Sequence, residues 1–214
     1  AFSTLGWFND PILSTALEAD DVEVVATVLH ELSHQHLFVP GQVGFNESFA
    51  TFVGRVGAAE FFCSRSREGG LGPDMEACGR AVARWRDYQR FSVFIDGLVD
   101  DLEAVYGDAS LSQQEKVARR GAVFQRALER FDTEVAPTFE SVSFGGFRTT
   151  PLNNATLLAR IRYFHRLPDF EALLEAHGSD LGAVLAHLQE RAPDADDPFE
   201  LLPRREASAI DAPS

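Results

Sequence analysis

The sequence predicts a mainly α-helical domain of the α+β class, with a small edge strand as its β element. Apolar residues recur at three- and four-residue intervals over long stretches, and residues that can cap helices precede these stretches. A long αα-hairpin accounts for residues 73–139. By contrast, residues 1–9, AFSTLGWFN, have the pattern of a short extended segment that ends at Asp10 and Pro11.

Helix caps and helix breakers divide the rest of the chain into successive helices. Asp20 or Asp21 can cap the first helix, and Asn46 can cap the second. Asn153 or Asn154 can cap the helix that follows the hairpin. The predicted helices cover residues 21–37, 47–64, 73–106, 112–139, 154–167, 168–177 and 180–191.

The two longest helical patterns have apolar seams that can face each other. This arrangement favours packing within an αα-hairpin, and recognition of a partner is the alternative role of the same seams. The seam of the first helix comprises Phe91, Ile95, Leu98, Leu102 and Val105. The seam of the second comprises Phe124, Leu128, Phe131 and Val135.

The composition is that of a folded and acidic protein. Of the 214 residues, 45% are hydrophobic, which is enough for one domain with a substantial core. A formal net charge of −14 disfavours nucleic acid and anionic membranes as partners, because the surface repels phosphate groups. No apolar run reaches about eighteen residues, so no transmembrane segment is predicted. We expect one domain over residues 1–192 and a loose acidic tail over residues 193–214.

The chain has two cysteines, Cys63 and Cys78. Neither has a second Cys or His close enough in sequence to form a zinc knuckle. A disulfide between them is compatible with an oxidising compartment, and two free, half-buried thiols are equally compatible with the sequence.

The segment HELSH, residues 30–34, predicts a metal site on the first helix. Successive helical residues rotate by about 100°, so His34 lies only about 40° from His30 and one turn further on. Two imidazoles in this position can bind one zinc ion at about 2 Å. Glu31 lies beside them, where a base for a water molecule at the metal is needed.

Other residues of this helix support a second reading of the motif. Glu23 and Thr27 share the face of the two histidines, so the pair could also continue a solvated polar face. His36 points away from the pair and is a poor ligand candidate. The face predicted to enter the core lies between about 160° and 260° from His30. That face carries Val25, Val28, Leu29 and Leu32.

Glu47 is the predicted third ligand, because catalytic zinc usually takes three protein ligands. Its helix has a face of small residues that would let the two helices approach closely, and a large apolar face for the core. The alternative role of Glu47 is a favourable charge at a helix N-terminus. Thr51, one turn on, could orient a ligand or could be an ordinary interior residue. The small face also carries Ala50, Gly54 and Ala58, and the large face carries Phe49, Phe52, Val53 and Val56.

Several motifs together resemble a known family. HELSHQ followed by FNESFATFV resembles the gluzincin metallopeptidases, in which a second helix carries N-E-x-x-A. With FSTLGWFNDPILST before them and PLNNATLL after them, the chain is similar to the bacterial predicted aminopeptidase family. The resemblance covers residue 2 to about residue 175 and implies gluzincin-like catalytic helices.

The resemblance implies one zinc ion per chain, bound by His30, His34 and Glu47, with Glu31 as base and proton shuttle. The segment around Gly6 and Trp7 would be the edge strand whose backbone pairs with an extended peptide substrate. Longer family members carry a further N-terminal region, often with a lipoprotein-type signal. The resemblance therefore implies a longer precursor and a periplasmic or membrane-anchored location, while a cytoplasmic location stays open.

Peptide hydrolysis also needs a group that stabilises the negative charge on the carbonyl oxygen. Among the three tyrosines, Tyr163 is the preferred candidate, with His165 as second choice and ordinary packing as the alternative. Tyr88 and Tyr106 fall in the long hairpin, where we expect interfacial aromatic residues. Asn153 and Asn154 are first of all helix caps, and one of them can also bind a substrate backbone. Arg148 could meet a substrate carboxylate or lie on the surface.

These observations together predict zinc-dependent peptide-bond hydrolysis, with aminopeptidase action implied by the resemblance. The G-x-M-E-N motif of aminopeptidases is absent from the sequence, so endopeptidase action stays open. A binding or scaffold protein with a structural or vestigial zinc is an alternative of another class. A metal-dependent hydrolase of non-peptide substrates is a further alternative.

Overall fold

The computed structural model describes residues 20–67 and 73–205, and every regular element in these ranges is a helix. The prediction of a mainly helical fold is thereby confirmed. The predicted edge strand, with Gly6 and Trp7, falls on residues 1–9 and lies outside the described residues. No helix within the described ranges combines the length and the apolar character that crossing a membrane requires.

The helices follow the order expected from the caps and breakers, with bounds that differ by a few residues. The α-helices are α2 (Asp21–His36), α3 (Val43–Arg67), α4 (Pro73–Gly107), α5 (Gln113–Arg130), α6 (Gly146–Thr149), α7 (Asn154–Phe164), α8 (Leu167–Ala176) and α9 (Leu181–Arg191). A π-helical turn (Phe131–Val135) and a 3₁₀ turn (Ala136–Thr138) continue α5, and 3₁₀ turns follow α9 at Ala192–Asp194 and Pro198–Leu201.

The turn between α2 and α3 is held by a side chain whose role was predicted wrongly. Asp20 caps α2 by accepting hydrogen bonds from the backbone of Val22 and Glu23, as expected. Asn46, however, lies inside α3 rather than at its N-cap. Its side-chain amide accepts from Val39 N at 2.9 Å and donates to Val39 O at 2.8 Å. This pair of bonds closes the turn and lets α3 begin a full turn earlier than the capping pattern indicates.

Helices α2 and α3 approach each other closely along the predicted small-residue face. A Cβ atom placed on Gly54 would lie 2.5 Å from the carbonyl oxygen of Ala26 and 3.2 Å from Cβ of His30. One placed on Gly57 would lie 2.7 Å from Cδ1 of Leu29. At Gly54 only glycine permits the observed contact, because the neighbouring atom belongs to the backbone, and this contact places Glu47 within reach of α2.

Replacing Gly54 by Ala is expected to lower the free energy of unfolding by about 1–3 kcal/mol, because the new methyl group overpacks the interface. Gly97→Ala in α4 is a matched control, since a Cβ there meets nothing within 4 Å. The control should be neutral or gain up to about 1 kcal/mol from helix propensity. Urea unfolding of both variants measures the difference. Equal stabilities would contradict the close α2–α3 contact.

The exposed side of α2 differs from the prediction. Leu32 is 51% exposed and Val28 is 37% exposed, so these two residues of the predicted core face do not enter the core, whereas Val25 packs against buried residues of α2, α3 and α4. The buried residues of α2 are Val22, Ala26 and Ser33. They form a narrow strip between the histidines and the aliphatic face, because α2 packs on α3 through small residues.

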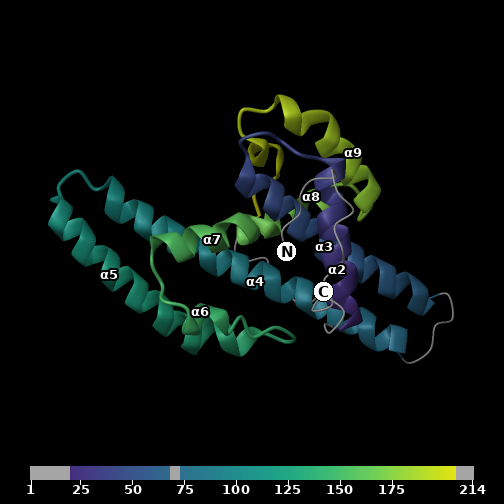
Figure 1. The fold of residues 1–214 in the computed structure, drawn as a ribbon, viewed down its shortest axis with the longest axis horizontal. Helices are drawn as coiled ribbons and strands as arrows, with labels where there is room; N and C mark the ends of the chain where they lie inside the picture. Colours follow the sequence, from purple (N-terminus) through teal and green to yellow (C-terminus); the bar gives the residue numbers. More distant parts are fainter. Residues whose placement is uncertain (1–19, 68–72, 206–214) are drawn as a thin grey trace, which may run out of the picture.

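The core has two main parts that share α4. In one part, the seams of α4 and α5 pack together with Phe147 and Leu157, which confirms the predicted αα-hairpin. Figure 1 shows α4 and α5 extending together, away from α8 and α9. In the other part, α3 packs on α8 and α9. Its largest side chains include Phe45, Phe49, Phe52, Phe170 and Phe199.

The prediction of a loose tail from residue 193 is wrong for the part of the tail that the structure describes. Phe199 and Leu202 are buried in the core. Arg166 donates hydrogen bonds to their carbonyl oxygens at 2.8 and 3.5 Å, and also contacts Asp169. The backbone of Arg205 donates to the same Asp169 at 2.8 Å. A buried arginine thus fixes a segment whose composition alone indicated a tail.

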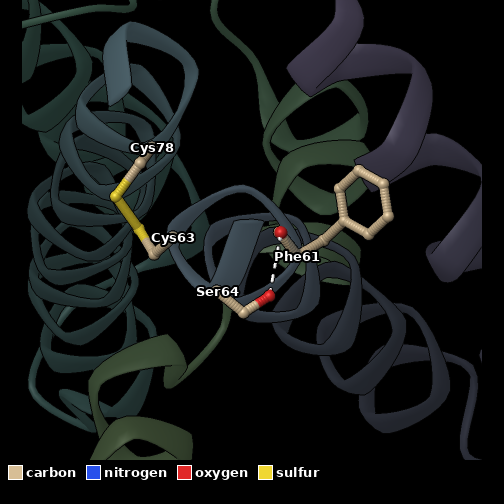
Figure 2. Close-up of a disulfide and its surroundings, with 4 residues drawn as sticks. All are labelled: Phe61, Cys63, Ser64 and Cys78. Atoms are coloured by element: carbon tan, nitrogen blue, oxygen red, sulfur yellow. Dashed lines mark hydrogen bonds between the residues drawn. A yellow bond between two sulfur atoms is a disulfide. The ribbon is translucent and has the colours of Figure 1, made fainter. Parts of the chain in front are cut away.

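Cys63 of α3 and Cys78 of α4 form a disulfide (Figure 2). Of the two states that the sequence allowed, the structure contains the bonded one. The bond joins residues 15 apart in sequence and fastens the two longest helices of the fold to each other.

A double variant with Cys63→Ser and Cys78→Ser is expected to lose about 3 kcal/mol of stability, because closing a loop of 15 residues restricts the unfolded chain. Urea unfolding with and without a reductant measures this. The native chain should weaken in the reductant and the double variant should not respond. A native chain that ignores the reductant would contradict the prediction.

Candidate metal centre

Two neighbouring helices bring the HELSH histidines and Glu47 together. His30 and His34 lie in the second half of α2, and Glu47 lies in the second turn of α3. The Nε2 atoms of His30 and His34 are 3.4 and 3.8 Å from Oε2 of Glu47. The three ligand atoms all lie within 4.8 Å of one another, so this group can hold a metal ion.

The two separations that involve Glu47 are near those of ligands on one small divalent ion. Two atoms that each lie about 2.0–2.1 Å from a tetrahedral ion are about 3.4 Å apart. The separations of 3.4 and 3.8 Å are close to this value. Within residues 20–67 and 73–205, the group has three members. Three protein ligands are typical of catalytic zinc sites, whereas structural sites have four.

The local electrostatics favour the protonation states that bind metals. The contact with His30 lowers the pKa of Glu47, and the charges of His34 and Arg162 lower it further, although burial acts in the opposite direction. Burial lowers the pKa of His34 and outweighs the opposing negative charge of Glu47. A carboxylate and a neutral imidazole are the ligating forms of these side chains.

The candidate metal-binding group, His30, His34 and Glu47, lies on the wall of a pocket of about 520 Å³. The pocket is bounded by α2, α3, α4 and α7, and Glu31 and Thr51 also line it. Glu31 is half-buried and follows His30 directly in the chain. The pocket therefore offers the predicted base a shared space with the three ligands.

Tyr163 reaches this pocket from the last turn of α7. Its ring lies 6.2 Å from the ring of His30, at an interplanar angle of 27°. Burial raises the pKa of Tyr163, and the negative charge of Glu47 contributes. The hydroxyl therefore keeps its proton at neutral pH and can donate a hydrogen bond within the pocket.

Comparison with known proteins decides the family. The model of a family described as "Putative aminopeptidase" matches residues 1–196, which is most of the chain. The chain belongs to this aminopeptidase family. A search of curated proteins and a search of solved structures each find no match.

In this member of the aminopeptidase family, three of the predicted site residues lie away from the pocket. His165 follows the end of α7, where its Nδ1 lies 2.6 Å from Oδ1 of Asp96. Asn153 caps α7, and the amide of Asn154 donates to the Tyr106 hydroxyl at 3.0 Å. Both asparagines are at the start of α7, whereas Tyr163 reaches the pocket from its end. All three side chains therefore interact with other residues of the fold and do not line the pocket.

Arg55 and Tyr88 line the pocket of this aminopeptidase-family chain but were not among the predicted site residues. Arg55 binds Glu23 through two hydrogen bonds of 2.6 and 2.8 Å and donates to the Tyr88 hydroxyl at 2.6 Å. Arg84 binds both Glu23 and Asp20. The polar face that Glu23 shares with the histidines is therefore covered by ion pairs and is not simply solvated. Glu47, Thr51 and Arg55 are spaced four residues apart and therefore lie on one face of α3, so this spacing could have indicated that Arg55 lines the same pocket as Glu47.

Proposed function

We propose that this chain is a zinc-dependent peptidase, with His30, His34 and Glu47 holding one zinc ion. The observation that carries this proposal is the three-member ligand group on the wall of a pocket that also contains Glu31. Membership of the aminopeptidase family supports peptides as the substrates. Bound zinc supplies Lewis acidity, which polarises a peptide carbonyl and lowers the pKa of a water molecule.

The remaining steps belong to side chains of the chain itself. Glu31 accepts the proton of the attacking water and delivers it to the leaving amine, which is general base and general acid catalysis by one carboxylate. Tyr163 donates a hydrogen bond to the oxygen that becomes negatively charged. Thr51 lies one turn after Glu47 on the pocket wall and helps to orient that ligand.

Endopeptidase action is the second candidate. The carboxylates that line the described part of the pocket are Glu31 and Glu47, and the proposal gives each a role. An aminopeptidase needs a further anionic group for the free amine of its substrate. Peptides with free and with acetylated N-termini separate the two activities, because only an endopeptidase cleaves both equally well.

Metal removal tests the proposal directly. We expect chelation to abolish hydrolysis of unblocked peptides, and equimolar zinc to restore it. The reason is that the carbonyl is not polarised without the ion. Hydrolysis that survives complete removal of zinc, as measured by elemental analysis, would contradict the proposal. The Cys63–Cys78 disulfide supports an oxidising compartment as the site of action, so the assay buffer contains no reductant.

A further inference from the structure

A second pocket, of about 480 Å³, lies beside the candidate metal centre. Five of the ten described residues that line it are aromatic, and they come from α4, α6, α7 and the segment before α6. In Figure 1, α7 lies over α4, between α3 and α6. The rings that line the pocket are Phe91, Phe144, Phe147, Tyr163 and Phe164.

The two pockets share one wall. Tyr163 and Phe164, at the end of α7, line both of them. Tyr163 also has its ring 6.2 Å from that of His30, as described above. A peptide held at the metal-binding group could therefore send one side chain past Tyr163 into the aromatic pocket.

The wall of the second pocket is held in a fixed shape. Phe144 has a φ of 46°, a backbone conformation that costs about 1–3 kcal/mol and persists only where surrounding contacts enforce it. Its ring stacks on Phe91 at 4.2 Å, with an interplanar angle of 9°. Arg160 donates to the carbonyl oxygens of Thr156 and Gly146, each at 2.9 Å. The pocket is thus pre-formed, as ligand pockets usually are.

We infer that this aromatic pocket binds a large apolar side chain of the peptide substrate, at the residue next to the cleaved bond. The inference rests on the proposed function, because that function places the cleaved bond at the metal. Binding of an apolar side chain to an aromatic wall is favourable, because the side chain leaves water and an aromatic one also contacts the rings. A small side chain such as that of Ala cannot fill the space.

Ala159→Trp tests the inference, since Ala159 lines the pocket and lies exposed on α7. Leu158→Trp is the matched control, because Leu158 is 59% exposed on the same helix and does not line the pocket. Two peptides are compared that differ only in Phe or Ala beside the cleaved bond. We expect the Phe-to-Ala ratio of kcat/KM to fall roughly ten- to hundredfold in Ala159→Trp and to keep its native value in Leu158→Trp.

A binding measurement separates this inference from the proposed function. The same two peptides are titrated into zinc-loaded Glu31→Gln chain, with and without Ala159→Trp, in a calorimeter. If both tryptophan variants cleave peptides with the same Phe-to-Ala ratio of kcat/KM, the inference about the aromatic pocket is wrong, and the proposed peptidase function stands. If no peptide is cleaved, but the Phe peptide binds more tightly and Ala159→Trp removes this preference, the aromatic pocket binds the side chain and the proposed peptidase function is wrong. Neither cleavage nor such binding overturns both. Thr150→Trp blocks the pocket from another segment if Ala159→Trp does not fold.

Discussion

Replacing Glu31 by Gln is expected to lower kcat for peptide hydrolysis by roughly 10²–10⁴-fold or more, because the amide cannot accept the proton of the attacking water. Glutamine keeps the size of the side chain, so the pocket and the metal-binding group keep their shape. Zinc content by elemental analysis should stay at the native value. Initial rates on an unblocked peptide, measured with zinc-loaded protein, give the comparison.

Glu60→Gln is the matched control for this variant. Glu60 is exposed on α3 and does not line the pocket, so the same chemical change there should leave kcat unaltered. If Glu31→Gln cleaves peptides at the native rate, Glu31 is not the base and the proposed mechanism is wrong. If it also loses zinc, the effect on kcat reports metal loss rather than proton transfer.

Replacing Glu47 by Ala is expected to remove most of the bound zinc. Two histidines remain on α2, and two ligands hold zinc far more weakly than three. Removal of a residue that only hydrogen-bonds to a ligand lowers metal affinity by roughly 10- to 100-fold. Removal of the ligand Glu47 itself should lower zinc affinity by more than this. A competition titration with a chromophoric chelator measures the dissociation constants of the native and variant chains.

Glu60→Ala controls for the loss of a carboxylate from α3. Thermal unfolding in the absence of metal shows whether Glu47→Ala has damaged the fold instead of the site. A native chain that binds no zinc even when zinc is supplied would remove the basis of the proposed function. Equal zinc affinity in the native chain and in Glu47→Ala would remove Glu47 from the ligands.

The proximity of His30, His34 and Glu47 could be predicted because their positions depend on short-range geometry. The spacing of His30 and His34 is fixed by the helical repeat, and Gly54 marks where a neighbouring helix comes close. The helical repeat does not predict which face of a helix packs against elements that are distant in the sequence. For that reason Leu32 was expected in the core, although it is 51% exposed.

Sequence alone is least informative for residues whose partners are far away in the sequence. His165 has the chemistry of an active-site residue, yet Asp96, 69 positions earlier, holds its ring. Arg55 donates a hydrogen bond to Tyr88, 33 positions later, and no local pattern indicates this partner. Composition likewise concealed the buried residues Phe199 and Leu202, because single apolar side chains among Pro and Asp show no periodicity.

The anchored C-terminal segment has a consequence for the order in which the chain folds during its synthesis. The two helices that carry the metal-binding group are adjacent in sequence and can pair early, because their contacts are local. The core that α3 packs against is incomplete until Phe199 is present, because its ring lies 5.4 Å from that of Phe45. The ribosome must therefore release the chain as far as Phe199 before α3 is fully packed. Until then the newly made protein exposes apolar rings, and this is the stage at which aggregation competes with folding.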